Sequence, residues 1–137
     1  MTDRDADASG DRPTVILDTN ALMMPVELDI RVFDELDRLV GDADLVVPRA
    51  VLAELERLRD AGNGEAATAA AVGRDLADRC RAVDSAASYA DDAVVELADG
   101  TDGYAVTNDR PLRDRLLDRG VRVIGLRGRT TLEITEP

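Results

Sequence analysis

The sequence predicts an α/β fold in three layers, with helices on both faces of a mainly parallel central sheet of about four to five strands. Short apolar runs alternate along the chain with longer stretches in which apolar residues recur at helical spacing, and this alternation is typical of parallel sheets. The chain has 137 residues, of which 45% are hydrophobic, which suits one domain with a core. We therefore expect one unit over residues 14–137, preceded by a disordered acidic tail over 1–13.

The first half of the chain contains a strand, a helix, a second strand and a second helix. Apolar residues at helical spacing predict a helix over 29–40, with Asp29 as its N-cap. Pro48 opens the next helix, which runs to about Asp60 and is broken by a Gly-Asn-Gly turn. Short apolar runs predict the strands, at 14–18 and 45–47.

The second half begins with an alanine-rich stretch that favours a long helix over 65–83. This helix could pack against a second copy of the chain, giving a homodimer, or against its own sheet. Gly100 and Gly120 are expected to end two further helices, over 91–99 and 109–119. The remaining elements are, in order, a helix over 91–99, a strand over 104–107, a helix over 109–119, and strands over 121–126 and 131–134.

The charge of the chain is strongly acidic. It has 29 Asp and Glu against 17 basic residues, all of them Arg, for a net charge of −12. Such a chain repels itself at low salt, whereas molar salt shortens the screening length to about 3 Å and relieves the repulsion. This composition is typical of halophilic proteins, so each acid is presumed superficial until its position says otherwise. We expect a cytoplasmic protein, because no apolar run could span a membrane and no signal-peptide core is present.

The residues that the chain lacks exclude several chemistries. It has no His, which rules out histidine-based nucleophilic triads, imidazole general bases and histidine zinc sites. Its single cysteine, Cys80, cannot form an internal disulfide or a thiolate cluster, and is expected to be a small core residue. Any hydrolytic chemistry must therefore use carboxylates, with a hard cation such as Mg²⁺ or Mn²⁺.

Two carboxylates follow predicted strands at the same edge of the sheet. Asp18 ends the apolar run V-I-L-D, where burial would remove its hydration, and Asp109 comes just after the strand over 104–107. In parallel sheets ligands bind beyond the carboxyl ends of the strands. Asp109 could instead simply cap its helix.

Two further acids are selected by their helical faces. Glu54 lies at the margin of an apolar stripe, although a solvated position is an equal alternative. Asp91 shares its face with Val94 and Ala98, which must turn toward the sheet, or it could serve as a cap or first-turn dipole partner. Asp92 lies about 100° further round the helix.

Four carboxylates in one half-buried cleft would repel one another, and a divalent cation would remove that repulsion. One or two Mg²⁺ or Mn²⁺ ions could also bind a phosphate oxygen and lower the pKa of a bound water. Asn20 and Asn108 sit beside the acids and, with Thr107, are candidate supporting polar groups that add no charge.

Four motifs together resemble the signatures of the PIN-domain nucleases: V-I-L-D-T-N-A-L, V-P-R-A-V-L-A-E-L, Y-A-D-D-A-V-V-E-L-A and Y-A-V-T-N-D-R-P-L-R-D-R-L. The chain is most similar to small archaeal members related to ribosomal-RNA processing factors and to VapC-type toxins. The resemblance implies a PIN-like fold and Mg²⁺- or Mn²⁺-dependent hydrolysis of RNA by a metal-activated water. It places the acidic ligands at Asp18, Glu54, Asp91 and Asp109, with Asp92 replacing Asp91 if the alignment shifts by one residue.

A chain with a charge of −12 is an awkward partner for RNA, because basic residues supply most of the affinity for a phosphate backbone. Residues 110–129, however, hold seven Arg against two Asp, a net charge of +5. Arg110 and Arg113, one helical turn from Asp109, could contact a substrate phosphate. Arg115 and Arg119 could equally pair with Asp side chains on a solvated face.

Three functions fit the sequence. The first is a metal-dependent endoribonuclease, either in RNA processing with a ribosome-assembly partner or as a toxin with an antitoxin. The second is a catalytically inactive PIN-like module that binds RNA or protein. The third is another phosphate-handling α/β domain, but a haloacid-dehalogenase-like phosphatase wants an Asp where this chain has Asn20, and a receiver domain wants a Lys that the chain lacks.

Overall fold

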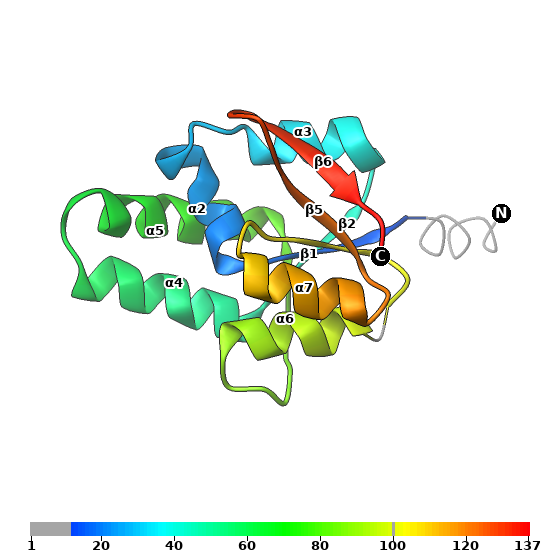
Figure 1. Cartoon of the computed structure of the whole chain (residues 1–137). Coiled ribbons are helices and arrows are strands. Elements are labelled where there is room, and N and C mark those ends of the chain that lie inside the picture. Colours follow the sequence, from blue (N-terminus) through cyan, green and yellow to red (C-terminus); the bar gives the residue numbers. More distant parts are fainter. Residues whose placement is uncertain (1–11, 100) are drawn as a thin grey trace, which may run out of the picture.

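The structure is a computed structural model that describes residues 12–99 and 101–137. Its centre is a six-stranded sheet with the order β3-β2-β1-β4-β5-β6 (Figure 1). The strands are β1 (Thr14–Leu17), β2 (Asp44–Pro48), β3 (Arg81–Val83), β4 (Tyr104–Val106), β5 (Arg122–Arg127) and β6 (Thr131–Thr135). The first five run parallel, and β6 is antiparallel to β5. The α/β class with a mainly parallel sheet is confirmed, with six strands rather than the four to five expected.

Helices flank this sheet, with α3 on one side of it and α6 and α7 on the other (Figure 1). They are α2 (Thr19–Glu27), α3 (Val32–Val40), α4 (Arg49–Ala61), α5 (Gly64–Leu76), α6 (Ala90–Asp99) and α7 (Arg110–Asp118), with a short 3₁₀ helix η1 (Ala77–Arg79). Helices α4 and α5 pack against each other as a hairpin that extends beyond the carboxyl ends of the strands (Figure 1). No described helix has the length and apolarity needed to cross a membrane.

Helix α2 was not expected from the sequence. Four consecutive residues, Ala21–Met24, are buried, so the segment lacks the alternating polar face that identifies most helices. Pro25 inside the helix also argues against helix in a sequence pattern. The prediction that Asp29 caps the following helix is wrong, because Asp29 has a left-handed backbone (φ 56) in the turn, and α3 begins three residues later, at Val32.

The expectation of one helix over 65–83 is wrong at its C-terminal end. The α-helix stops at Leu76, and residues 81–83 form β3, which pairs in parallel with β2. Sheet pairing overrides the helix propensity of the alanine-rich segment there. Cys80, just before β3, is half-buried against the core, and burial raises the pKa of its thiol to about 11, as suits a packing residue.

Helix α5 uses its small residues within the chain. Ala69, Ala70 and Gly73 are buried, and a Cβ at Gly73 would lie 2.8 Å from the backbone oxygen of Leu22. This close approach seats α5 on α2 and α4 rather than on the sheet. The small-residue face is therefore occupied inside the fold, and homodimer formation stays a prediction.

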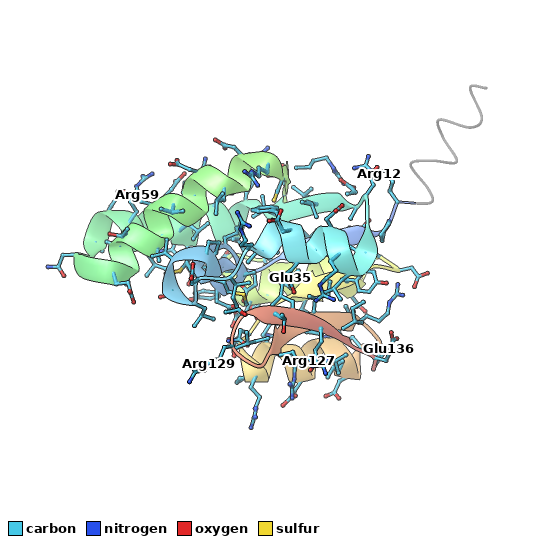
Figure 2. All side chains as sticks on the ribbon, turned by 90° about the horizontal axis from the view of Figure 1, so that it is seen from above. Arg12, Glu35, Arg59, Arg127, Arg129 and Glu136 are labelled. Atoms are coloured by element: carbon cyan, nitrogen blue, oxygen red, sulfur yellow. The ribbon has the colours of Figure 1, made fainter. Side chains whose placement is uncertain are left out.

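The edge strand β6 is tied to α3. The carboxylate of Glu35 accepts a hydrogen bond from the backbone N–H of Leu132 (2.9 Å), and Arg38 donates to the carbonyl of the same residue (2.9 Å). Figure 2 shows Glu35 on α3 above this strand, with Arg127 and Arg129 at the β5–β6 hairpin. These bonds protect part of an edge that would otherwise expose unpaired backbone groups.

Candidate active site

Asp18 and Asp109 follow two neighbouring strands. Asp18 lies between β1 and α2, and Asp109 lies between β4 and α7. Strands β1 and β4 are paired in parallel, and the backbone N–H of Asp18 donates to the carbonyl of Val106 at 3.1 Å. Both carboxylates therefore start from the same edge of the sheet, as the sequence predicted from the strand ends.

One carboxylate oxygen of Asp18 accepts hydrogen bonds, and the other has no partner in the described structure. Its side chain is 2% exposed, and its Oδ2 accepts hydrogen bonds from the Thr107 hydroxyl (2.9 Å) and from Asn20 Nδ2 (2.8 Å). Its Oδ1 is buried and has no hydrogen-bond partner among the described residues. An orphaned buried carboxylate oxygen is costly unless a cation or donor meets it.

Thr107 and Asn20 connect the two strand ends into one network. The Thr107 hydroxyl accepts hydrogen bonds from the backbone N–H of Asp109 (3.1 Å) and from Asn20 Nδ2 (3.2 Å), while it donates to Asp18. Asn20 Oδ1 accepts from the backbone N–H of Asn108 at 2.8 Å. Asn108 joins this network only through its backbone N–H. Of the three polar side chains expected to support the site, those of Thr107 and Asn20 make hydrogen bonds within it.

Glu54 approaches the site from α4. It is half-buried and accepts a hydrogen bond from the hydroxyl of Thr19, the residue after Asp18. Sequence reasoning did not identify Thr19 as a site residue, because its partner lies 35 residues away and the crossing of α2 by α4 is not visible in a local pattern. The only signal was its place in the D-T-N stretch.

Asp91 and Asp92 stand in the first turn of α6 and differ in their partners. Asp92 accepts a charge-assisted hydrogen bond from Arg115 on α7 at 2.9 Å, whereas Asp91 joins none of the ion pairs found in the described part of the chain. Both are exposed, and both line a pocket of about 410 Å³ together with Glu54. The free carboxylate of Asp91 makes it the better candidate ligand of the pair.

The pKa values show that these acids share one electric field. Burial raises the pKa of Asp18 to about 6, against hydrogen bonds from the Thr19 backbone and Thr107 that lower it, and the charges of Asp91 and Glu54 add to the rise. Although Asp91 is exposed, partial desolvation raises the pKa of its carboxyl, the charges of Asp109 and Glu54 raise it further, and Arg115 opposes them. Asp91 and Glu54 therefore act on Asp18, and Asp109 and Glu54 act on Asp91.

The side-chain carboxylate of Asp109 does not cap α7. It occupies the N-cap position of α7, with extended backbone angles, but makes no side-chain cap hydrogen bond. In the described residues no three acidic or cysteine side chains are already gathered closely enough to ligate one ion. The candidate donors are nevertheless all oxygen atoms, which suit a hard cation such as Mg²⁺ or Mn²⁺, and Asp18 Oδ1 is buried without a partner in the described structure.

A second pocket, of about 240 Å³, lies between the start of α7 and the β5–β6 hairpin. Arg110 and Arg113 line it together with Thr107. The Nε of Arg113 is buried and makes no hydrogen bond in the described structure, and it lies 3.8 Å from Asp114. By contrast Arg115 and Arg119 donate to Asp92 and Asp99 at 2.9 Å, as the solvated-face alternative predicted for them.

A family model described as a PIN-like domain matches residues 15–129. The chain belongs to this PIN-like family. This match agrees with the resemblance read from the four motifs, which lie within residues 15–116. A search of curated protein sequences finds no match.

Solved structures show the same fold. The PIN domain endonuclease Utp24 aligns with a TM-score of 0.75 at 22% identity, covering 94% of this chain and 96% of that chain. VapBC2 from Rickettsia felis, bound to a DNA fragment from its promoter, aligns with a TM-score of 0.61 at 14% identity, covering 82% of this chain and 98% of that chain. At these identities the likeness establishes the PIN-like fold.

Proposed function

We propose that this PIN-like domain is an endoribonuclease that uses Mg²⁺ or Mn²⁺, one or two ions, to hydrolyse RNA phosphodiester bonds. The observation that carries the proposal is the buried Oδ1 of Asp18, which has no hydrogen-bond partner among the described residues, in a carboxyl group whose pKa is also raised by the charges of Asp91 and Glu54. A structural aspartate would satisfy both oxygens or be replaced by a neutral residue, because a buried charge without a partner destabilises the fold.

The network around Asp18 suits a metal ligand. Thr107 and Asn20 hold Oδ2 and fix the carboxylate plane, so that Oδ1 is presented without freedom to rotate. The hydroxyl of Thr19 holds one carboxylate oxygen of Glu54 by a hydrogen bond in the same way. Asp109 and Asp91 complete the oxygen donor set. When bound, the ion would supply Lewis-acid stabilisation of a phosphate oxygen and a water of lowered pKa.

The second pocket supports a role in holding the substrate. Arg110 and Arg113 provide positive charge next to Thr107, on the α7 side of the acidic site. Guanidinium groups bind phosphate oxygens with two parallel hydrogen bonds, and the Nε of Arg113 makes no hydrogen bond in the described structure. We infer that these residues contact a substrate phosphate beside the scissile bond.

The proposal covers two biological settings. Utp24 is described as a PIN domain endonuclease, and the Rickettsia protein is part of a VapBC pair. By analogy the chain would act either in RNA processing with a ribosome-assembly partner, or as a VapC-type toxin held by an antitoxin. The acidic, lysine-free composition further suggests that it works in concentrated salt.

Cleavage of a structured RNA in molar KCl with Mn²⁺ tests the proposal. We expect the parent protein and the control Asp118→Asn, an exposed acid at the end of α7, to cut equally. Asp18→Asn and Asp109→Asn should lose cutting while keeping the parent circular dichroism spectrum. Equal cutting by all four proteins rejects the proposal. RNA binding without cutting by the parent favours the inactive PIN-like module.

A further inference from the structure

Tyr89 is an exposed aromatic residue that no contact within the fold explains. The chain has one Phe and two Tyr, with no Trp. Arg79 stacks over Phe33, with its guanidinium carbon 4.9 Å from the ring centre, and Arg122 stacks over Tyr104 at 4.1 Å. Tyr89 is 74% exposed and has no such partner among the described residues.

The position of this ring places it next to the acidic site. Tyr89 immediately precedes α6, and its carbonyl accepts the backbone N–H of Ala93 at 2.9 Å, which fixes its backbone to the first turn of the helix. Its side chain lines the pocket of about 410 Å³ that also contains Glu54 and Asp91. A volume of this size is in the range of small-ligand pockets. Arg57 lines the same pocket one turn after Glu54.

An exposed aromatic ring lets an acidic protein bind RNA by stacking, without relying on positive charge. The net charge of −12 opposes a phosphate backbone, and contacts from Arg to phosphate weaken as salt rises. Stacking of a base on an aromatic side chain does not depend on charge, and it accepts any base because each has a π-face. Only an unpaired base can offer its face, since bases in a duplex are covered on both sides.

We propose that Tyr89 is a stacking platform for an unpaired nucleobase beside the scissile phosphate. The inference rests on the proposed nuclease function and assigns a base-binding residue to its site. Tyr89 lines the same pocket as Glu54 and Asp91, and Arg110 and Arg113 line the pocket that includes Thr107, which is hydrogen-bonded to Asp18. A strand that occupies both pockets would therefore contact residues of the acidic site from each of them.

Binding of a fluorescein-labelled single-stranded RNA tests the inference without requiring cleavage. The measurement uses Asp18→Asn as background, so that no RNA is cut, and compares Tyr89→Ala, Tyr89→Phe and the control Leu28→Ala, which truncates an exposed apolar side chain outside this pocket. We expect Tyr89→Ala to bind about 5- to 150-fold more weakly. Tyr89→Phe and Leu28→Ala should bind like the background protein, and the effect of Tyr89→Ala should persist in molar KCl.

Several results would overturn the inference. They are equal binding by Tyr89→Ala and Tyr89→Phe, an equal loss for a duplex of the same sequence, or no measurable RNA binding by the background protein. Equal binding would point instead to a contact with a protein partner. The nuclease proposal is tested separately, by cutting with the parent protein. Absence of cutting would reject that proposal whatever the effect of Tyr89→Ala on RNA binding.

Discussion

The hydroxyl of Thr107 donates a 2.9 Å hydrogen bond to the carboxylate of Asp18, across 89 residues of sequence. This bond joins the ends of two neighbouring parallel strands. It also fixes which carboxylate oxygen is used inside the protein and which one is left for a ligand.

Removing this hydroxyl should weaken both the fold and the site. In Thr107→Val, Asp18 Oδ2 keeps only Asn20 as a side-chain donor, and we expect a loss of about 1–3 kcal/mol in the free energy of unfolding. Thr107→Ser, which keeps the hydroxyl, should lose less than half of that. Urea unfolding of the three proteins at one salt concentration measures the difference. A loss in Thr107→Ser without a loss in Thr107→Val would show that the methyl group, not the hydrogen bond, matters.

Asp18 should make the metal-free protein less stable as pH rises. Its pKa is raised from 3.8 to about 6, so the folded state binds more protons than the unfolded chain between these values. The associated stability is fully present below about pH 4 and is lost as pH rises through about 6. Asp18→Asn removes this titration, so it should exceed the parent by up to about 3 kcal/mol at pH 8.

Urea unfolding with EDTA at pH 5 and pH 8 measures this stability. The advantage of Asp18→Asn over the parent should grow with pH, and Asp118→Asn should show no such trend. A parent protein whose stability, relative to Asp18→Asn, is flat or rises over this range would contradict the raised pKa.

Substitution of Asp91 should affect RNA cutting, whereas substitution of Asp92 should affect mainly stability. Asp91→Asn removes a carboxylate with no ion pair and should abolish cutting, while Asp92→Asn removes a half-exposed pair with Arg115 and should cost only about 0.2–1 kcal/mol of stability. Single-turnover cleavage and thermal unfolding of both variants measure this. Loss of cutting in Asp92→Asn with full cutting in Asp91→Asn would shift the ligand by one residue.

Arg113 should contribute to RNA binding in a salt-dependent way. Replacing it with Gln removes one phosphate contact, so the slope of log affinity against log salt should fall by about 1. Arg119→Gln is the control at the opposite end of α7, because the Arg119 guanidinium is engaged with Asp99 and lies outside the Arg110–Arg113 pocket. Equal slopes for the two variants would remove Arg113 from the substrate path.

The sequence was sufficient for the fold class because most strands are short runs with apolar centres, and helices separate all of them except β5 and β6. It failed in α2, where four consecutive residues are buried, and where an alanine-rich segment leaves its helix to extend the sheet as β3. Both failures arise from tertiary contacts that no local pattern encodes.

The candidate site could be predicted where position alone is informative. A carboxylate that ends an apolar strand, such as Asp18, is visible in the sequence, and so is Asp109 after the next strand in the sheet. The Thr19–Glu54 bond joins residues 35 positions apart and depends on how α2 and α4 cross. The Thr107–Asp18 bond joins residues 89 positions apart and depends on the pairing of β1 with β4. The difference between Asp91 and Asp92 likewise required the position of Arg115 on α7.

Calorimetric titration of Mn²⁺ into the metal-free protein is the most direct test of the claim that these acids share a cation. The account predicts that the parent and Asp118→Asn bind Mn²⁺ with the same affinity, and that Asp18→Asn and Asp109→Asn lose binding by at least about tenfold. Equal affinity in all four proteins, or no binding by the parent, would contradict it.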